Sequence, residues 1–295
     1  MTKRVTRTFI VGSEWLYYKI YTGHKTSDKV LTEIIMPISI KLIKKRVIEK
    51  WFFIRYADPN HHIRVRFLIN NPKNINEVIS ILYGHLNDFI EQDLIWKIEI
   101  DTYKRELERY GLQTMELSET LFYHDSNSIV KFLDLIEGSE GEQLRWLFGL
   151  RSIDHLLSSF NYSIEEKLEL LSHLKTGFGK EFGMTRFLKK QLDDKYRKER
   201  EKIESFVTFT RKSHPSYEPI LKILNTKGKA IKPLAEQILY LHADRKLQLE
   251  INNLMESYTH MLMNRLFKSK NRLNEMVVYD FLYRYYKSAF ALKYS

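Results

Sequence analysis

The chain contains no cysteine among its 295 residues. Disulfides, thiolate nucleophiles and cysteine-based metal sites are therefore excluded. It also lacks any apolar run long enough to cross a membrane, because the most apolar stretch, residues 31–42, is interrupted by Glu33, Pro37 and Lys41. The N-terminus has basic residues but neither a long apolar core nor a small-residue cleavage site. We therefore expect a cytoplasmic protein without a membrane span.

Several catalytic and binding motifs are missing as well. There is no phosphate-binding glycine loop, no nucleophile elbow and no histidine pair at a metal-binding spacing. His61 and His62 are adjacent, so on a strand they would point to opposite faces. We expect neither a metal nor a cofactor. The formal net charge of +11 favours acidic or polyanionic partners, but the basic residues match no nucleic-acid-binding motif, so direct nucleic-acid binding is not expected.

The hydrophobic pattern changes once along the chain and predicts an α+β fold. Residues 1–114 predict a mixed or antiparallel sheet with crossing helices, and residues 115–295 predict a predominantly helical part of the same single domain. In the first part, strands are expected at 15–21 and 94–103, and helices at 28–47, capped by Ser27 or Asp28, and at 75–90. Further helices are expected at 115–136, 140–159, 164–174, 185–211, 231–267 and 271–292, with breaks at 138–139, 177–183, 214–215 and 225–229.

The segment WFFIRYADPNHHIRVRF, residues 51–67, predicts two strands joined by a turn at 58–60. In the second strand, apolar residues alternate with polar ones, so Arg64 and Arg66 share a face and could grip an anion together. The alternative is an ordinary solvated strand face. Because residues 51–56 are apolar on nearly both faces, we expect that strand to be central and buried, and the arginines beside it to line a cleft.

Two further groups of residues could contribute chemistry. Glu106 and Arg109 are three residues apart, so on a helical turn the carboxylate could orient the guanidinium; the alternative is an ordinary surface ion pair. His260 lies on the flank of an apolar helical stripe, with Asn264 one turn later. Such a histidine is either an acid/base group or a structural one, and the pattern alone does not choose between them.

Six motifs in series resemble the C-terminal domain of class I lanthibiotic dehydratases, the thiopeptide-type bacteriocin biosynthesis family. They are WLYYKIY at residue 15, the segment at 51–67, ERYG at 108–111, Met115-Glu116, Asp125-Ser126 and HMLMNR at 260–265. One departure is Leu112, where the family often has a second glycine. The large glutamylation domain of full-length relatives is absent from these residues, so the resemblance is to the stand-alone form.

The resemblance implies that the protein removes glutamate from glutamylated serine and threonine of a precursor peptide, which leaves dehydroalanine or dehydrobutyrine. It implies a precursor peptide with a leader and a separate tRNA-dependent glutamylation protein as partners, and it leaves a homodimer open. The family's catalytic positions fall on Arg64, Arg66, Arg109 and His260. Supporting positions fall on Glu106, Asn264 and Arg265.

The resemblance also leaves two other functions open. Divergent members of the family build a pyridine ring from two dehydroalanines, and they tend to lose the arginine and histidine pattern that this chain keeps. The chain could instead bind the leader peptide or the glutamylating partner without catalysis. If it eliminates glutamate, the arginines and His260 should line one common pocket.

Overall fold

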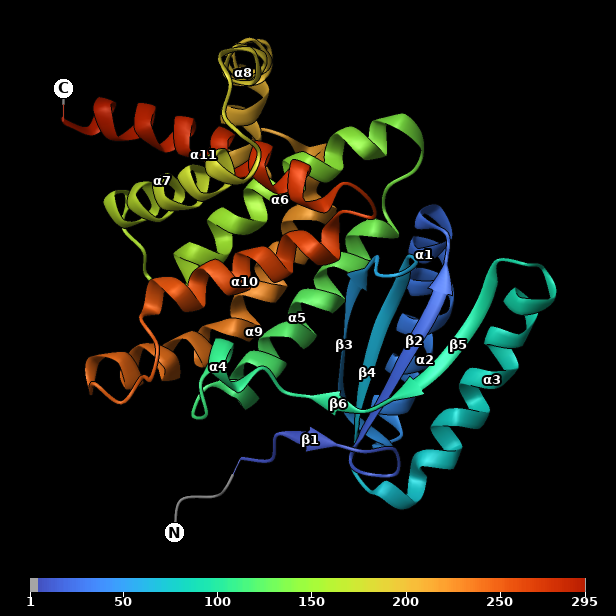
Figure 1. The fold of residues 1–295 in the computed structure, drawn as a ribbon. Coiled ribbons are helices and arrows are strands. Elements are labelled where there is room, and N and C mark those ends of the chain that lie inside the picture. The colour runs from blue at the N-terminus through green and yellow to red at the C-terminus, as the bar shows by residue number, and fades with distance from the viewer. Residues whose placement is uncertain (1–4, 295) are drawn as a thin grey trace. The chain divides into compact units, whose positions relative to one another are not determined.

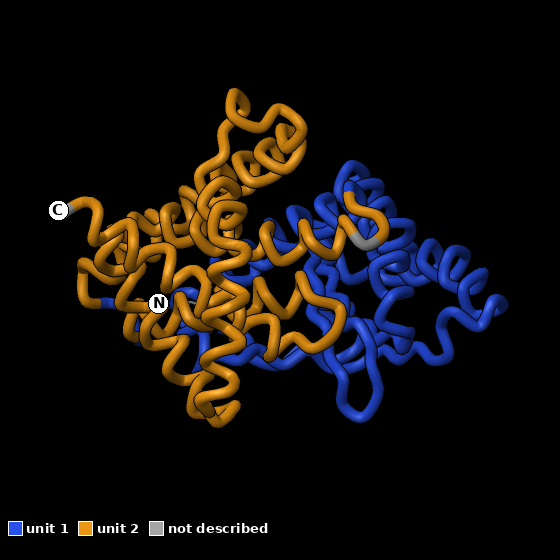
Figure 2. Tube along the Cα trace, turned by 90° about the horizontal axis from the view of Figure 1, so that it is seen from above, with its two compact units in different colours: residues 1–135, 246–249 blue, residues 136–245, 250–295 orange. Residues whose placement is uncertain are grey.

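The computed structural model describes residues 5–294 and divides the chain into two compact units (Figure 2). Unit 1 contains residues 1–135 and 246–249, and unit 2 contains residues 136–245 and 250–295. All strands of the described residues lie in the first 104 positions, and the remainder is helical. The predicted α+β class, with an antiparallel sheet followed by a mostly helical half, is therefore confirmed.

The main sheet of unit 1 has four antiparallel strands in the order β3-β4-β2-β5 (Figure 1). These strands are β2 (Trp15–Thr22), β3 (Ile48–Tyr56), β4 (His62–Ile69) and β5 (Ile95–Asp101). A short ladder joins β1 (Thr8–Phe9) to β6 (Tyr103–Lys104). The turn between β3 and β4 is the predicted Asp58-Pro59-Asn60, and it makes the two strands a hairpin that places Arg64 and Arg66 in the interior of the sheet.

Strand β3 is an edge strand, and not the central strand that its apolar composition predicts. Its composition has a different cause. Helix α5 (Met115–Leu133) covers this edge, and the Ser126 hydroxyl accepts a hydrogen bond of 3.2 Å from the backbone N–H of Phe53. A covered edge is dry on both faces of the strand, so apolar residues suit both.

The first helical segment of unit 1 begins earlier than predicted. It consists of α1 (His24–Lys29), a π-helical turn η1 (Val30–Ile35) and α2 (Met36–Lys44). The N-cap is Gly23, so the cap expected at Ser27 or Asp28 is wrong. The π-helical turn ends next to Pro37, which has no N–H to donate to the preceding turn. Helix α3 (Ile75–Glu91) matches its prediction within one residue.

Unit 2 contains six α-helices among its described residues. They are α6 (Gly138–Ser159), α7 (Ile164–Glu181), α8 (Arg186–Thr208), α9 (Glu218–Ala243), α10 (Ile251–Leu266) and α11 (Asn271–Tyr294). A 3-10 turn at Pro215–Tyr217 precedes α9. The single helix predicted for 231–267 is wrong, because α9 and α10 are separate. The break predicted at 225–229 is also wrong. Gly228 lies inside α9, where a Cβ atom would come within 2.2 Å of the His155 ring, so this glycine permits close packing instead of ending a helix. Among the described residues, no helix is long and apolar enough to span a membrane.

Candidate functional site

The two strand arginines lie on one face of the sheet, which we call the arginine face. Arg66 on β4 lies between Phe52 on β3 and Tyr17 on β2, and Arg64 lies between Ile54 and Lys19 in the next row. The opposite face of β4 carries the apolar set Ile63, Val65, Phe67 and Ile69, all of which are buried. The alternation predicted from the sequence is therefore present, but its polar side is not an ordinary solvated face.

Arg66 is the most unusual side chain of this face, because it is a buried cation that pairs with no carboxylate in residues 5–294. Only 8% of its surface is exposed. Its guanidinium carbon lies 4.4 Å from the ring centroid of Tyr17, 4.9 Å from that of Tyr103 and 5.3 Å from that of Phe52. The Nε atom is buried without a hydrogen-bond partner among the described residues. Stacking on aromatic rings stabilises the charge, but it leaves the N–H donors available to a ligand.

The buried carboxylate of Glu119, which contacts Tyr103, already has a cationic partner in Arg105. Arg105 donates to it through Nε and Nη2, both at 2.7 Å, and the Tyr103 hydroxyl donates at 2.8 Å. Burial, followed by the charge of Glu119, raises the pKa of Tyr103 well above its usual value, so the phenol stays protonated as a donor. Because Glu119 is paired with Arg105, the positive charge of Arg66 remains uncompensated.

Arg64 is held by two neighbours on the same face. Its guanidinium carbon lies 3.5 Å from the ring centroid of Tyr56, and its Nε donates to Nε2 of His62 at 3.0 Å. Burial lowers the pKa of His62, and its Nδ1 donates to the carbonyl oxygen of Asn60 at 2.8 Å. The ring is therefore neutral with its proton on Nδ1, which is the tautomer that can accept from Arg64.

Arg109 lies on the short helix α4 (Leu107–Tyr110), and Glu106 immediately precedes that helix. The two form an ion pair of 3.5 Å, as their three-residue spacing predicts. The Arg109 side chain is 33% exposed, so it remains accessible to a ligand. Gly111 ends the turn at φ +73°, a conformation that favours glycine.

A chain of aromatic contacts in unit 1 connects the surroundings of Arg109 to those of Arg66. Arg109 lies over Tyr110, whose ring contacts Phe122 at 5.1 Å, and Phe122 contacts Phe52 at 5.5 Å. Phe52 is one of the rings that pack against Arg66. The surroundings of Arg109 and of Arg66 therefore share one set of packed aromatic rings within unit 1.

His260 on α10 forms a hydrogen-bonded pair with Glu275 on α11, both in unit 2. Its Nδ1 atom lies 2.9 and 3.0 Å from the two carboxylate oxygens. The Glu275 carboxylate is only 2% exposed and also accepts from the Tyr279 hydroxyl at 2.8 Å and from Arg272 Nη1 at 3.2 Å. A carboxylate accepts, so the neutral imidazole carries its proton on Nδ1 and keeps a lone pair on Nε2. The His260 side chain is 27% exposed, and its contact with Glu275 fixes the orientation of the ring.

The two predicted supporting residues that follow His260 differ in exposure. Arg265 is completely buried on the inner side of α10, so any support it gives is through packing and hydrogen bonding inside unit 2. Asn264 is half-buried, and its backbone oxygen accepts a hydrogen bond from the Asn271 side chain at 3.0 Å, which links the end of α10 to the start of α11.

The predicted site residues therefore fall into two groups. Arg64, Arg66, Glu106 and Arg109 belong to unit 1, and His260, Asn264 and Arg265 belong to unit 2. Their meeting in one pocket stays a prediction. Sequence reasoning missed Glu275 and Glu119, because each lies far along the chain from the group it serves and has no distinctive spacing. The aromatic neighbours of Arg66 could have been predicted from the sequence, since Tyr17, Phe52 and Tyr103 all lie in aromatic-rich segments.

The fold and these side chains define an α+β protein with a partly buried arginine face in unit 1 and an oriented histidine in unit 2. The chain belongs to the family described as lantibiotic biosynthesis dehydratase C-term, whose model matches residues 15–286. It is 29% identical to the subtilin biosynthesis protein SpaB of Bacillus subtilis over 163 residues, and 30% identical to the nisin biosynthesis protein NisB of Lactococcus lactis subsp. lactis over 135 residues. These alignments cover 54% and 44% of this chain, but only 15% of SpaB and 13% of NisB.

The fold is similar to three solved structures. The tRNA-dependent lantibiotic dehydratase MibB from Microbispora sp. 107891 matches with a TM-score of 0.70 and 20% identity, over 92% of this chain and 28% of that protein. TsrL matches with a TM-score of 0.66 and 13% identity, over 94% of this chain and 95% of its own. The pyridine synthase TbtD from thiomuracin biosynthesis matches with the same score and identity, over 93% of this chain and 99% of its own.

Proposed function

We propose that the protein eliminates glutamate from glutamylated serine or threonine residues of a ribosomal precursor peptide. The observation that carries this proposal is Arg66, a buried guanidinium with no anionic partner among the described residues. A buried charge without a partner is costly to the fold, so its retention is best explained by a ligand that supplies the missing anion. A glutamyl ester becomes such an anion when it leaves.

In this proposal the lone pair of His260 Nε2 takes the α-proton of the glutamylated residue. The electrons of the broken Cα–H bond form the Cα=Cβ double bond, the Cβ–O bond breaks, and glutamate leaves as a carboxylate with that electron pair. Arg66 stabilises the departing carboxylate, and Arg109 binds the glutamyl group. Glu275 holds the imidazole in the required tautomer and stabilises the imidazolium formed after proton transfer.

Family membership and the kept residue pattern support elimination over pyridine-ring formation. Arg64, Arg66, Arg109 and His260 are all present, and each has neighbours that orient it. The likeness to TbtD is in fold alone, at 13% identity. The precursor peptide and a tRNA-dependent glutamylating protein are the partners that this function requires.

The test is incubation of the purified protein with a glutamylated precursor peptide, followed by mass spectrometry. We expect the loss of one glutamic acid for each modified residue. The His260→Ala variant should bind the peptide but leave it glutamylated, whereas His242→Ala, which removes an exposed histidine of α9, should retain activity. An unchanged peptide mass under conditions where binding is measured would contradict elimination. Conversion of a peptide that already carries dehydroalanines would instead identify ring formation.

A further inference from the structure

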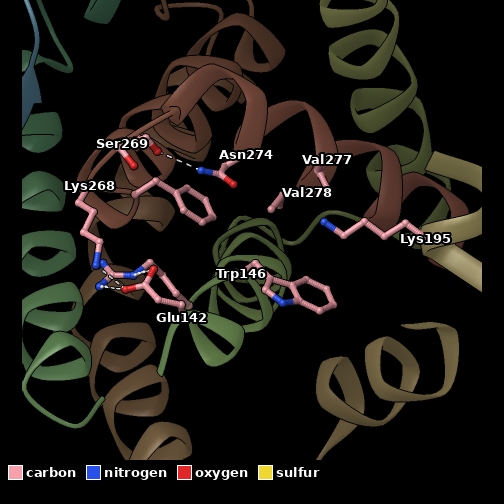
Figure 3. Close-up of a pocket in the computed structure, with 10 residues that line it drawn as sticks. Glu142, Trp146, Lys195, Lys268, Ser269, Asn274, Val277 and Val278 are labelled. Atoms are coloured by element: carbon pink, nitrogen blue, oxygen red, sulfur yellow. Dashed lines mark hydrogen bonds and ion pairs between the residues drawn. The ribbon is translucent and has the colours of Figure 1, made fainter. Parts of the chain in front are cut away.

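Unit 2 contains a cavity of about 120 Å³ that none of the residues discussed above lines (Figure 3). Its walls come from α6, α8, the segment between α10 and α11, and the first turns of α11. All of these elements belong to unit 2. A space of this size can hold a side chain or a small organic molecule in addition to water.

The polar part of the wall has an excess of positive charge. Three cations, Arg145, Lys195 and Lys268, face one carboxylate, Glu142, which leaves an excess of two. Lys268 Nζ lies 2.5 Å from Glu142, and Arg145 Nε lies 3.3 Å from it, so this carboxylate is shared by two cations. Within residues 5–294, Lys195 forms no ion pair and no side-chain hydrogen bond.

The remaining wall is apolar and aromatic. Trp146 on α6 and the buried side chains of Phe267 and Val278 form it. Figure 3 shows the Lys195 side chain extending from α8 toward the space between Trp146 and Val278, with its nitrogen foremost. The Lys195 ammonium group therefore lies beside an apolar wall. Elsewhere in the wall, Arg145 and Lys268 share the single carboxylate of Glu142, so that part of the cavity also carries an excess of positive charge.

We propose that this cavity binds a carboxylate carried on a short apolar stem. The carboxylate contacts the Lys195 ammonium, and the stem lies against Trp146 and Val278. The acidic side chain of a peptide and a free dicarboxylic acid share this chemistry. A cation would be repelled by the excess positive charge, and an inorganic phosphate would leave the apolar wall unused.

Binding can be observed directly because Trp146 lines the cavity. The chain has four tryptophans, so protein made with 5-fluorotryptophan should give four ¹⁹F resonances, and Trp146→Phe identifies the one from the cavity. The probes are glutarate and a blocked Leu-Glu-Leu tripeptide. We expect at least one of them to shift the Trp146 resonance in a saturable way, and the comparison of the two assigns the ligand as a free acid or a peptide side chain. Glutaramide and the Leu-Gln-Leu tripeptide should shift nothing.

Two variants on one helix test the assigned contact. Lys195→Gln should weaken binding by about tenfold or more, the usual loss for one charge-assisted hydrogen bond. Lys198→Gln removes an exposed lysine of α8 that does not line the cavity, and it should bind like the unmodified protein. The proposal is wrong if neither probe moves the Trp146 resonance, if the neutral probes move it equally, or if the two lysine variants have the same effect.

Discussion

The Nδ1 atom of His260 lies 2.9 Å from one carboxylate oxygen of Glu275 and 3.0 Å from the other. This contact sets the tautomer of the ring, and it predicts separate effects for the two residues. His260→Ala should slow elimination by roughly 10²–10⁴-fold with peptide binding nearly unchanged. Glu275→Gln keeps the shape but removes the charge that stabilises the imidazolium, so we expect a smaller loss in single-turnover rate.

The control for Glu275 is its neighbour Tyr279, whose hydroxyl donates to the same carboxylate. Tyr279→Phe keeps the charge of Glu275 and its contact with His260, and it should slow elimination less than Glu275→Gln does. Equal rates for all three variants and the unmodified protein would contradict a base role for His260.

Arg66 predicts an opposition between stability and activity. Arg66→Met keeps the length of the side chain but removes a buried charge that has no anionic partner within residues 5–294. We expect the free energy of unfolding to rise by about 1 kcal/mol or more, while elimination is lost. Arg66→Lys keeps the charge and loses the planar grip, so it should impair turnover without this gain. Urea unfolding and peptide mass spectrometry check the two halves, and a destabilised Arg66→Met protein would refute the argument.

Replacing Arg109 or Glu106 by alanine should impair the reaction to different extents. Arg109→Ala should weaken both the binding of a glutamylated peptide and its conversion, because the guanidinium is accessible to the glutamyl group. Glu106→Ala removes only the residue that orients it, through an ion pair that is largely exposed, so a smaller effect is expected. Peptide titration followed by single-turnover kinetics separates binding from chemistry. A larger loss in Glu106→Ala than in Arg109→Ala would reverse these assigned roles.

The sequence predicted the elements whose pattern is set locally and failed where tertiary contacts decide. The hairpin at 51–67 and the helices at 75–90 and 115–136 follow their own periodicity, and the structure contains them. Apolar residues on both faces of a strand usually indicate a central position, and this pattern predicts such a position for β3. The prediction fails because a helix that covers the edge of a sheet excludes water from an edge strand as well. Gly228 was assigned to a break, but the need for it comes from the ring of His155.

The site was predictable only to the extent that residue types and spacing reveal it. The shared face of Arg64 and Arg66 follows from the two-residue period of a strand. The uncompensated charge of Arg66 does not, because it depends on Arg105 pairing with Glu119 across fourteen positions. The partner of His260 likewise comes from another helix, fifteen residues later.

The half-buried histidine His61 predicts the pH dependence of stability. Burial, and then the nearby positive charges, lower its pKa from 6.5 to about 4, while its Nδ1 donates to the carbonyl oxygen of Thr22 at 2.7 Å. The unfolded chain therefore takes up a proton at this site below about pH 6.5, whereas the folded protein does so only near pH 4. Stability from this group should be complete above about pH 6.5 and should fall as the pH is lowered toward 4.

This prediction is checked by urea unfolding at several pH values in that window. His61→Asn retains a donor for Thr22 but does not titrate, so the decline in unfolding free energy should be shallower in this variant. Burial also lowers the pKa of His62, so this residue should account for part of the pH dependence that remains in the His61→Asn variant. Identical slopes for the two proteins would show that His61 is not the group responsible.

The last prediction concerns two serines of α5 that are two positions apart and have opposite hydrogen bonding. Ser126 accepts from the Phe53 N–H at the edge of the sheet, whereas the buried Ser128 hydroxyl has no hydrogen-bond partner among the described residues. Ser126→Ala leaves a buried backbone donor unsatisfied, which should lower the free energy of unfolding by about 1–3 kcal/mol. Ser128→Ala removes an unsatisfied group and should be neutral or stabilising. Urea unfolding of the two variants gives the comparison directly. Equal destabilisation would mean that the loss is one of helix packing, and that the hydroxyl of Ser126 does not protect the edge of β3.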